Sequence, residues 1–454
     1  TGAISVTTAN DAVTFNHSID GGQALTLVSG TAATAVQGTI GGTTAITSLT
    51  ATNTTAVGTM EFSNIEGVTG ATAIGNTNTA TITLDGTAYS TAGTQTYTAA
   101  AGQNIDITGA AATFTTTNDN IGFATSGVDL ANNGTTTINT GTGAGTVTFG
   151  AALETNGGDN DLLVVTSGTG DVTFTGAIGA TNALGGLSVN ASAGDGDIVF
   201  TSTIGDTSNG AGVIGITAIG NAATEDITFS STDYSFDGAT TITAAAGDNI
   251  DMSSAVEFTT VADNITFATG NIHLADGANL DIDTGAAGGN ITIGAEIAGT
   301  TLETVTLDAG TGTTSVGVIG TGTEIAALSI GSAENGGITL NGAIVTDGAV
   351  TFDGPVTLAT GAVSVTTGDN ALTFNHTIDG AQALTLVSGT AATAVQGEIG
   401  GTTALSSLTA TNTTAAGTIE LTNIGGVTGA TAIGNTNTAT LTLDGTAYST
   451  GGTQ

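Results

Sequence analysis

Residues 172–179 read Val172-Thr173-Phe174-Thr175-Gly176-Ala177-Ile178-Gly179, and they begin with an apolar–polar–apolar triplet. Similar triplets recur along the chain: Val147-Thr148-Phe149, Ile198-Val199-Phe200, Ile227-Thr228-Phe229, Ile265-Thr266-Phe267, Ile291-Thr292-Ile293 and Val350-Thr351-Phe352. Because side chains alternate across a strand, both apolar residues of a triplet face one side and the central residue faces the other. A short strand that returns about every 25 residues predicts one coil of a β-helix, with Thr on the outside.

The segments between the triplets favour turns. They contain Gly-Asp, Asn-Gly, Gly-Gly and Asp-Gly pairs, which supply positive φ angles. No sustained 3.6-residue apolar period is present, so we do not expect helices. A string of β-sandwich modules is the competing fold, but such modules usually have a core Trp and Pro-rich linkers. This chain has 1 Pro and no Trp, so we predict an all-β, parallel β-solenoid of roughly 25 residues per coil, built from tandem repeats.

A long repeat organises the chain. Residues 1–95 recur as residues 360–454, an offset of 359, and 78 of the 95 aligned positions are identical. We therefore interpret residues 1–359 as one full long unit of β-solenoid and residues 360–454 as the start of the next unit, in an array that we expect to continue.

Finer repeats lie inside the long unit. Residues 72–76 (Thr-Ala-Ile-Gly-Asn) return at residues 217–221, an offset of 145. A Gly-x-Ile-Gly phrase is followed by Leu nine residues after its Ile. The Ile–Leu pairs are Ile40 and Leu49, Ile178 and Leu187, Ile319 and Leu328, and Ile399 and Leu408.

The composition excludes several partners. The 454 residues include no Lys or Arg and 38 Asp and Glu, which gives a formal charge of −38. Nucleic acid needs Lys or Arg to neutralise phosphate, and an anionic membrane surface repels an acidic chain. The absence of Cys excludes disulfides and thiolate metal sites. A hydrophobic fraction of 39% argues against disorder. No signal peptide or membrane-spanning apolar run is evident.

Three stretches carry a resemblance to a known family. They are Val172 to Gly179, Ile338-Thr339-Leu340-Asn341-Gly342-Ala343-Ile344, and the run from Gly38 that leads to Leu49-Thr50. These stretches resemble the repeats of filamentous-haemagglutinin-like and autotransporter-like giant bacterial exoproteins, which are β-strand-repeat surface proteins. The resemblance implies a right-handed parallel β-helix, secretion, and a role at the cell surface. The complete lack of Lys and Arg departs from typical members and points toward sheaths, surface layers or filaments.

Few residues qualify as site candidates. His17 and His376 occupy matching positions, and we interpret them as turn residues after a strand rather than metal ligands. His273 is alone and is a weaker candidate still. Ca²⁺ prefers carboxylate and carbonyl oxygens. Acidic Gly-rich turns make Asp159, Asp161, Asp195 and Asp197 the candidates for a calcium site, with solvated Asx turns as the alternative. The full calcium-binding nonapeptide repeat is absent.

These observations lead to a functional prediction. We expect no catalytic residues and no enzymatic activity, because no cluster of acids, bases or nucleophiles stands out. We predict a structural repeat module of a large secreted, extracellular cell-surface protein that self-associates into a fibre, sheath or layer. The alternatives are the stalk of a bacterial adhesin and a calcium-dependent or carbohydrate-binding module. Glycans or a host or neighbouring cell surface are the other possible partners, whereas Thr-x-Thr strands are too irregular for ice binding.

Overall fold

The computed structural model describes residues 2–131, 133–157, 160–205, 210–300, 302–331 and 336–454. Within them the regular secondary structure is β-strand, without helices, so none of these residues forms a long apolar helix able to cross a membrane. The parallel sheets form a β-solenoid of about 18 turns with roughly 24 residues per turn. This result confirms the predicted all-β solenoid and its coil length. The chain divides into two compact units. Unit 1 comprises residues 1–238 and 242–245, and unit 2 comprises residues 239–241 and 246–454.

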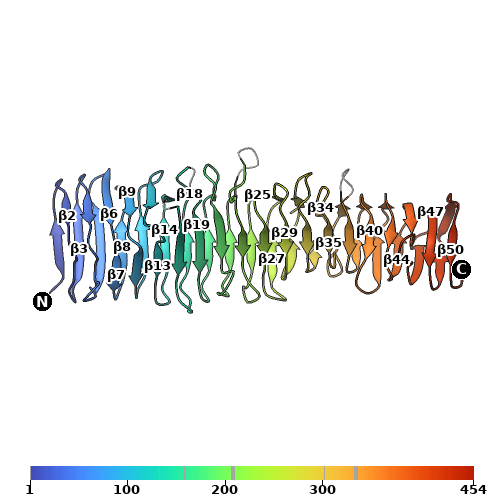
Figure 1. The fold of residues 1–454 in the computed structure, drawn as a ribbon, viewed down its shortest axis with the longest axis horizontal. Helices are drawn as coiled ribbons and strands as arrows, with labels where there is room; N and C mark the ends of the chain where they lie inside the picture. Colours follow the sequence, from blue (N-terminus) through green and yellow to red (C-terminus); the bar gives the residue numbers. More distant parts are fainter. Residues whose placement is uncertain (1, 132, 158–159, 206–209, 301, 332–335) are drawn as a thin grey trace. The chain divides into compact units, whose positions relative to one another are not determined.

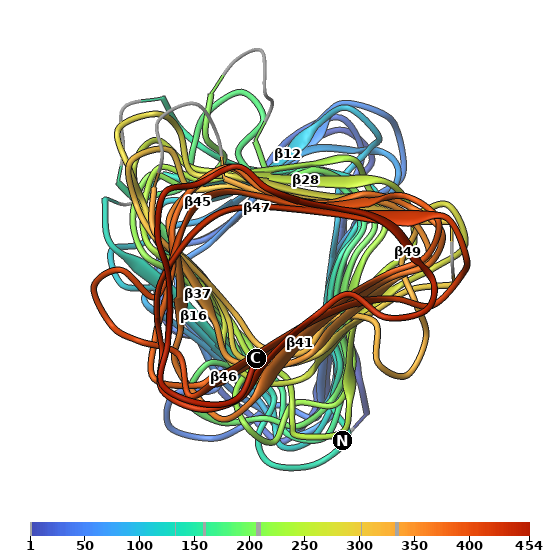
Figure 2. The same ribbon diagram turned by 90° about the vertical axis from the view of Figure 1, so that its right-hand side faces the viewer.

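The turns of unit 1 have three faces, seen along the turns in Figure 2, with strands of successive turns side by side in Figure 1. The first face consists of β1 (Ile4–Thr7), β3 (Ala24–Ser29), β5 (Ser48–Asn53), β8 (Thr72–Gly75), β11 (Gln95–Thr98), β14 (Ile121–Ala124), β17 (Val147–Phe149), β20 (Val172–Phe174), β22 (Ile198–Phe200) and β24 (Ile227–Phe229). The second face consists of β2 (Val13–Phe15), β4 (Thr34–Val36), β6 (Gly58–Phe62), β9 (Thr79–Leu84), β12 (Asn104–Ile107), β15 (Gly127–Leu130), β18 (Leu153–Thr155), bridges at Ile178 and Ile204, and β25 (Asp233–Ser235). The third face consists of bridges at Ile19 and Ile40, then β7 (Ile65–Val68), β10 (Ala88–Thr91), β13 (Thr113–Thr115), β16 (Thr135–Asn139), β19 (Leu162–Thr166), β21 (Gly186–Val189) and β23 (Thr217–Ile219).

Unit 2 repeats the same plan, and β26 (Thr240–Ile242) contributes residues to both units. One face consists of β27 (Asn249–Met252), β30 (Asn271–Leu274), β33 (Ile297–Ala298), a bridge at Ile319, β38 (Ile344–Thr346), β41 (Val363–Thr367), β44 (Ala383–Ser388), β46 (Ser407–Asn412) and β48 (Thr431–Ile433). The next consists of β28 (Val256–Thr259), β31 (Leu280–Asp283), β34 (Thr304–Asp308), β36 (Ala327–Ile330), β39 (Val350–Phe352), β42 (Leu372–Phe374), β45 (Ala392–Ile399), β47 (Gly417–Val427) and β49 (Thr438–Leu443). The last consists of β29 (Ile265–Phe267), β32 (Ile291–Ile293), β35 (Thr314–Val316), β37 (Ile338–Leu340), β40 (Val356–Leu358), β43 (Ile378–Asp379), the ends of β45 and β47, and β50 (Tyr448–Thr450).

The triplets build the core as their alternation predicts. In β20 the side chains of Val172 and Phe174 are buried, while Thr173 between them is partly exposed. The same buried–intermediate–buried pattern holds for the triplets of β17, β22 and β24. Because parallel strands stack about 4.8 Å apart, equivalent apolar residues of successive turns contact one another.

An aromatic ladder marks the first face of unit 1. Phe123, Phe149, Phe174, Phe200 and Phe229 stack in order, with successive ring centroids 5.2, 5.0, 5.1 and 5.3 Å apart. The planes of successive rings differ by at most 13°. Each such pair contributes roughly 0.5–1.5 kcal/mol beyond simple burial. The ladder therefore favours the pairing register in which the phenylalanines of successive turns are adjacent, because a shifted register would separate the rings.

The Gly-x-Ile-Gly phrase forms a tight corner. Ile40 is fully buried, and Gly41 after it has a φ of 75°. A Cβ atom at Gly41 would lie 2.0 Å from the carbonyl oxygen of Gly67 in the next turn. Glycine is required here for both conformation and space. The equivalent Gly400 has a φ of 71° and the same close approach to Gly426.

The finer repeat is not a whole number of turns. Residues 72–75 form β8 on the first face, whereas residues 217–219 form β23 on the third face. Likewise Ile40 lies on the third face and Ile178 on the second. One strand with its corner, a third of a turn, is therefore the element that repeats.

The long repeat does keep its register. Ile4 pairs with Leu25 in the first copy, and Val363 pairs with Leu384 in the second. The boundary between residues 359 and 360 lies within unit 2, where β38 pairs with β41 and β40 with β43.

Candidate functional site

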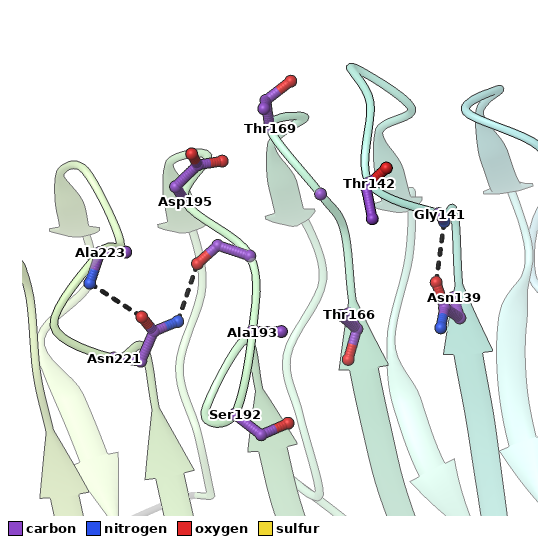
Figure 3. Close-up of a pocket in the computed structure, with 12 residues that line it drawn as sticks. Asn139, Gly141, Thr142, Thr166, Thr169, Ser192, Ala193, Asp195, Asn221 and Ala223 are labelled. Atoms are coloured by element: carbon purple, nitrogen blue, oxygen red, sulfur yellow. Dashed lines mark hydrogen bonds between the residues drawn. The ribbon is translucent and has the colours of Figure 1, made fainter.

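A groove crosses four successive turns of unit 1 at the corner between the third and first faces (Figure 3). Its volume is about 520 Å³. It is formed by the loops that follow β16, β19, β21 and β23. Figure 3 shows Thr142, Thr169 and Asp195 toward the tips of three successive loops, with Asn139 and Thr166 at the ends of their strands.

Hydrogen bonds and glycine hold these loops together. The Asn139 side-chain oxygen accepts the Gly141 N–H at 2.8 Å. The Gly168 N–H donates to the Gly141 carbonyl of the preceding turn at 3.1 Å. A Cβ atom at Gly168 would lie 2.4 Å from the carbonyl oxygen of Gly143, so only glycine permits this loop stacking.

Asn221 ties the last two loops of the groove. Its amide nitrogen donates to the Gly194 carbonyl at 2.7 Å, and its side-chain oxygen accepts the Ala223 N–H at 2.8 Å. Both bonds are drawn in Figure 3. The wall at this end is therefore held by the side chain of Asn221 as well as by the backbone.

Several hydroxyl groups of the groove are not used by the fold. The hydroxyls of Thr142, Thr166, Thr169 and Ser192 make no hydrogen bond with other described residues. A hydroxyl is both a donor and an acceptor. The groove therefore offers free hydrogen-bonding groups on three successive turns.

The calcium candidates are not brought together. Asp159 lies outside the described residues. Asp161 is buried just before β19, and its carboxylate accepts the Gly134 N–H at 3.0 Å. Asp195 lines the groove, whereas the Asp197 carboxylate accepts the Asp226 N–H of the next turn at 3.1 Å. Among the described residues, no three His, Asp or Glu side chains are grouped so that they hold a metal ion, and the calcium site stays a prediction.

No histidine is among the residues that line the groove. His17 is an exposed bend residue that follows β2, as its sequence position suggests. His273 on β30 lies beside Asp251 on β27, with Nδ1 2.9 Å from the carboxylate oxygen. This contact is an ion pair when the imidazole is protonated.

An acidic column on the second face of unit 1 was not predicted. Asp106, Asp129 and Glu154 occupy register positions on β12, β15 and β18. Burial raises the pKa of all three carboxyls above their ordinary values, and the charge of Asp129 raises the pKa of Asp106 and Glu154 further. Hydrogen bonds from backbone N–H groups oppose the shift at Glu154, and the Asn104 amide opposes it at Asp129. A cavity of about 230 Å³ lies beside Asp106 and Asp129.

The sequence contains the signal for this column. Acidic residues occupy the outward position of strands at residues 105–107, 128–130 and 153–155. Finding the column required knowing that these strands share a face. Outward carboxylates about 4.8 Å apart repel one another, so the column destabilises its own turns at neutral pH.

Comparisons with known proteins identify no relative of this chain. The chain matches no family model, no curated protein and no solved structure.

Proposed function

We propose that this chain is a structural repeat module of a large secreted cell-surface protein, and that such modules build an extracellular fibre, sheath or surface layer. The observation that carries the proposal is the junction between copies of the long repeat. At residues 359–360 the turns stack without a linker: β38, β39 and β40 before the junction pair in parallel with β41, β42 and β43 after it. A copy of the long repeat that follows another in this way lengthens the solenoid without a new kind of interface.

The contacts inside the two copies support the same conclusion. The amide of buried Asn53 donates to the Ser29 hydroxyl at 2.9 Å, and Asn412 donates to Ser388 at 2.9 Å. Buried polar groups of this kind are expensive unless they are paired. Because the Asn–Ser hydrogen bond occurs in both copies, the second copy forms the same turn-to-turn contact as the first.

The negative charge of the chain opposes side-by-side assembly of such modules. With a formal charge of −38 and no Lys or Arg, side-by-side copies repel unless salt or cations screen them. Assembly of the module is therefore expected to depend on ionic strength. The proposal assigns the chain no catalysis.

Electron microscopy of the purified chain at rising salt concentration tests the proposal. A structural module forms ordered filaments or sheets once its charge is screened. An adhesin stalk, the alternative function, stays monomeric at every salt concentration, and that result contradicts the proposal. Assembly that needs calcium and is abolished by the double substitution Asp195→Asn and Asp197→Asn, but not by Asp11→Asn, would transfer the function to the calcium-dependent alternative.

A further inference from the structure

The groove of unit 1 has the features of a ligand site and not only of a gap between loops. Its volume of about 520 Å³ is within the range of small-molecule sites, roughly 300–1,000 Å³. The hydroxyls of Thr142, Thr169 and Ser192 are exposed at its walls and are not bonded to other described residues. The loops that carry them are held by stacked backbone hydrogen bonds, such as the Thr169 N–H to the Gly143 carbonyl at 2.9 Å. The walls are therefore preorganised, whereas their hydroxyl groups are free to bind.

The chemistry of the lining selects among ligand classes. The residues around the groove are Gly, Ala, Ser, Thr, Asn and one acid, Asp195. No aromatic or long aliphatic side chain is among them, so a lipid or an aromatic ligand finds only methyl groups and backbone to pack against. Phosphates, sulfates and uronic acids need a cationic partner, and this chain has no Lys or Arg. An uncharged ligand rich in hydroxyl groups matches the lining.

The arrangement along the groove indicates an extended ligand. Thr142, Thr169 and Asp195 are placed on three successive loops, as Figure 3 shows. Strands of successive turns are about 4.8 Å apart, so the loops that they carry present polar groups one turn after another along the groove. A ligand that presents hydroxyl groups at a regular interval uses several turns at once. We propose that this groove binds a linear, uncharged glycan chain that lies across the turns. The inference does not depend on the structural role proposed above.

Calorimetric titration of the whole chain with defined oligosaccharides tests the inference. The probes are the uncharged β-1,4-linked and β-1,3-linked hexasaccharides of glucose, glucose itself, and the negatively charged hexasaccharide of galacturonic acid. We expect at least one neutral hexasaccharide to bind, glucose to bind at least tenfold more weakly, and the acidic hexasaccharide not to bind. Absence of binding by both neutral hexasaccharides, or equal binding of the acidic one, overturns the proposal.

Substitutions then locate the site. The variant with Thr142→Val, Thr169→Val and Ser192→Ala removes three free hydroxyls and leaves the loop backbone unchanged. Because up to three hydrogen bonds to the ligand are lost, binding should weaken about tenfold or more. The matched control carries Thr14→Val, Thr59→Val and Thr87→Val at exposed positions outside the groove and should bind like the parent chain. Equal affinity of the groove variant and the control, with both folded by circular dichroism, would refute the site.

Discussion

Several acidic residues accept hydrogen bonds from the backbone of the neighbouring turn. One carboxylate oxygen of Asp20 accepts the N–H groups of Thr43 and Thr44 at 2.8 and 2.9 Å. These backbone hydrogen bonds lower the pKa of Asp20 below its ordinary value of 3.8. In the second copy Asp379 accepts the equivalent pair of N–H groups at 2.8 and 2.9 Å. At these two corners the carboxylate therefore serves as a hydrogen-bond acceptor that joins one turn to the next.

Val57 is the residue at which backbone strain is most evident. It has a φ of 73° and its side chain is 69% exposed, so a β-branched residue occupies a left-handed conformation without packing in return. We predict that Val57→Gly stabilises unit 1 by about 1 kcal/mol. Backbone strain of this kind typically costs about 1–3 kcal/mol, and part of the stability recovered by removing it is offset by the greater conformational entropy of glycine in the unfolded chain. The urea midpoint measures the change.

The same loop offers a matched control. Thr55 is exposed, and its φ is not in the left-handed region. Thr55→Gly should therefore lower the midpoint slightly, since glycine adds only unfolded-state entropy there. At the equivalent position in the second copy, Ala416 with a φ of 81° should gain from Gly by a smaller amount. A lower midpoint for Val57→Gly would show that the loop is not strained.

Among the elements, the second face of unit 1 combines a favourable core with an unfavourable surface. The inward residues of β12, β15 and β18 are buried apolar side chains, except for Thr155 at the end of β18. The outward residues Asp106, Asp129 and Glu154 are carboxylates in register. Like charges placed directly opposite each other in neighbouring strands destabilise the pair by up to about 1 kcal/mol. The three strands are therefore held by their core against repulsion on their outer side.

We predict that Asp129→Asn stabilises unit 1 at pH 7 and has little effect at pH 3. The pKa of Asp129 is raised above 3.8 by burial, so the folded state favours the protonated acid. The destabilisation is complete above the raised pKa and disappears as the pH falls below 3.8, the ordinary value. Thermal unfolding at both pH values measures the effect, which we expect to be a few tenths of a kcal/mol at this half-exposed site.

Asp11→Asn serves as the control for net charge. Asp11 is exposed and has no acidic neighbour in register, so its substitution should change stability less than Asp129→Asn at pH 7. Equal effects of the two substitutions would mean that total charge, and not the column, governs the stability of this face.

For the whole chain, side-chain electrostatics is repulsive at neutral pH. The sequence has 38 acids and no Lys or Arg, and the one ion pair in the described part of the chain, His273 with Asp251, forms only when the imidazole is protonated. Stability must come from burial, backbone hydrogen bonds and turn-to-turn contacts. Tandem repetition supplies these contacts again with every turn.

We predict that the melting temperature rises with salt, by about 2 °C or more between 10 and 150 mM NaCl. The Debye length falls from about 30 Å to about 8 Å over this range, which screens the repulsion between neighbouring turns. Scanning calorimetry measures the shift. An uncharged osmolyte at equal osmolality is the control for general solvent effects, and a melting temperature that falls with salt would contradict a repulsive surface.

The sequence by itself determined the class of fold. The apolar–polar–apolar triplets, of which Val172 to Phe174 is one, contain their own alternation, and strand alternation is a local property of the backbone. The offset of 359 residues likewise appears in the sequence and keeps its pairing register in the structure. The Gly-x-Ile-Gly phrase also recurs in the sequence, and the structure gives its physical reason: Ile40 is buried and Gly41 has a positive φ.

Only the tertiary structure decided which strands share a face. Turn length varies, from 18 residues between Ile338 and Val356 to 30 between Leu187 and Thr217. Loop length at the corners therefore determines which outward side chains become neighbours. The local apolar–polar pattern of a strand does not show which strands will be adjacent. The column at Asp129 and the groove at Thr169 both arise in this way. Asp195 and Asp197 are two residues apart, yet one lines the groove and the other accepts a backbone N–H, because their surroundings come from other turns.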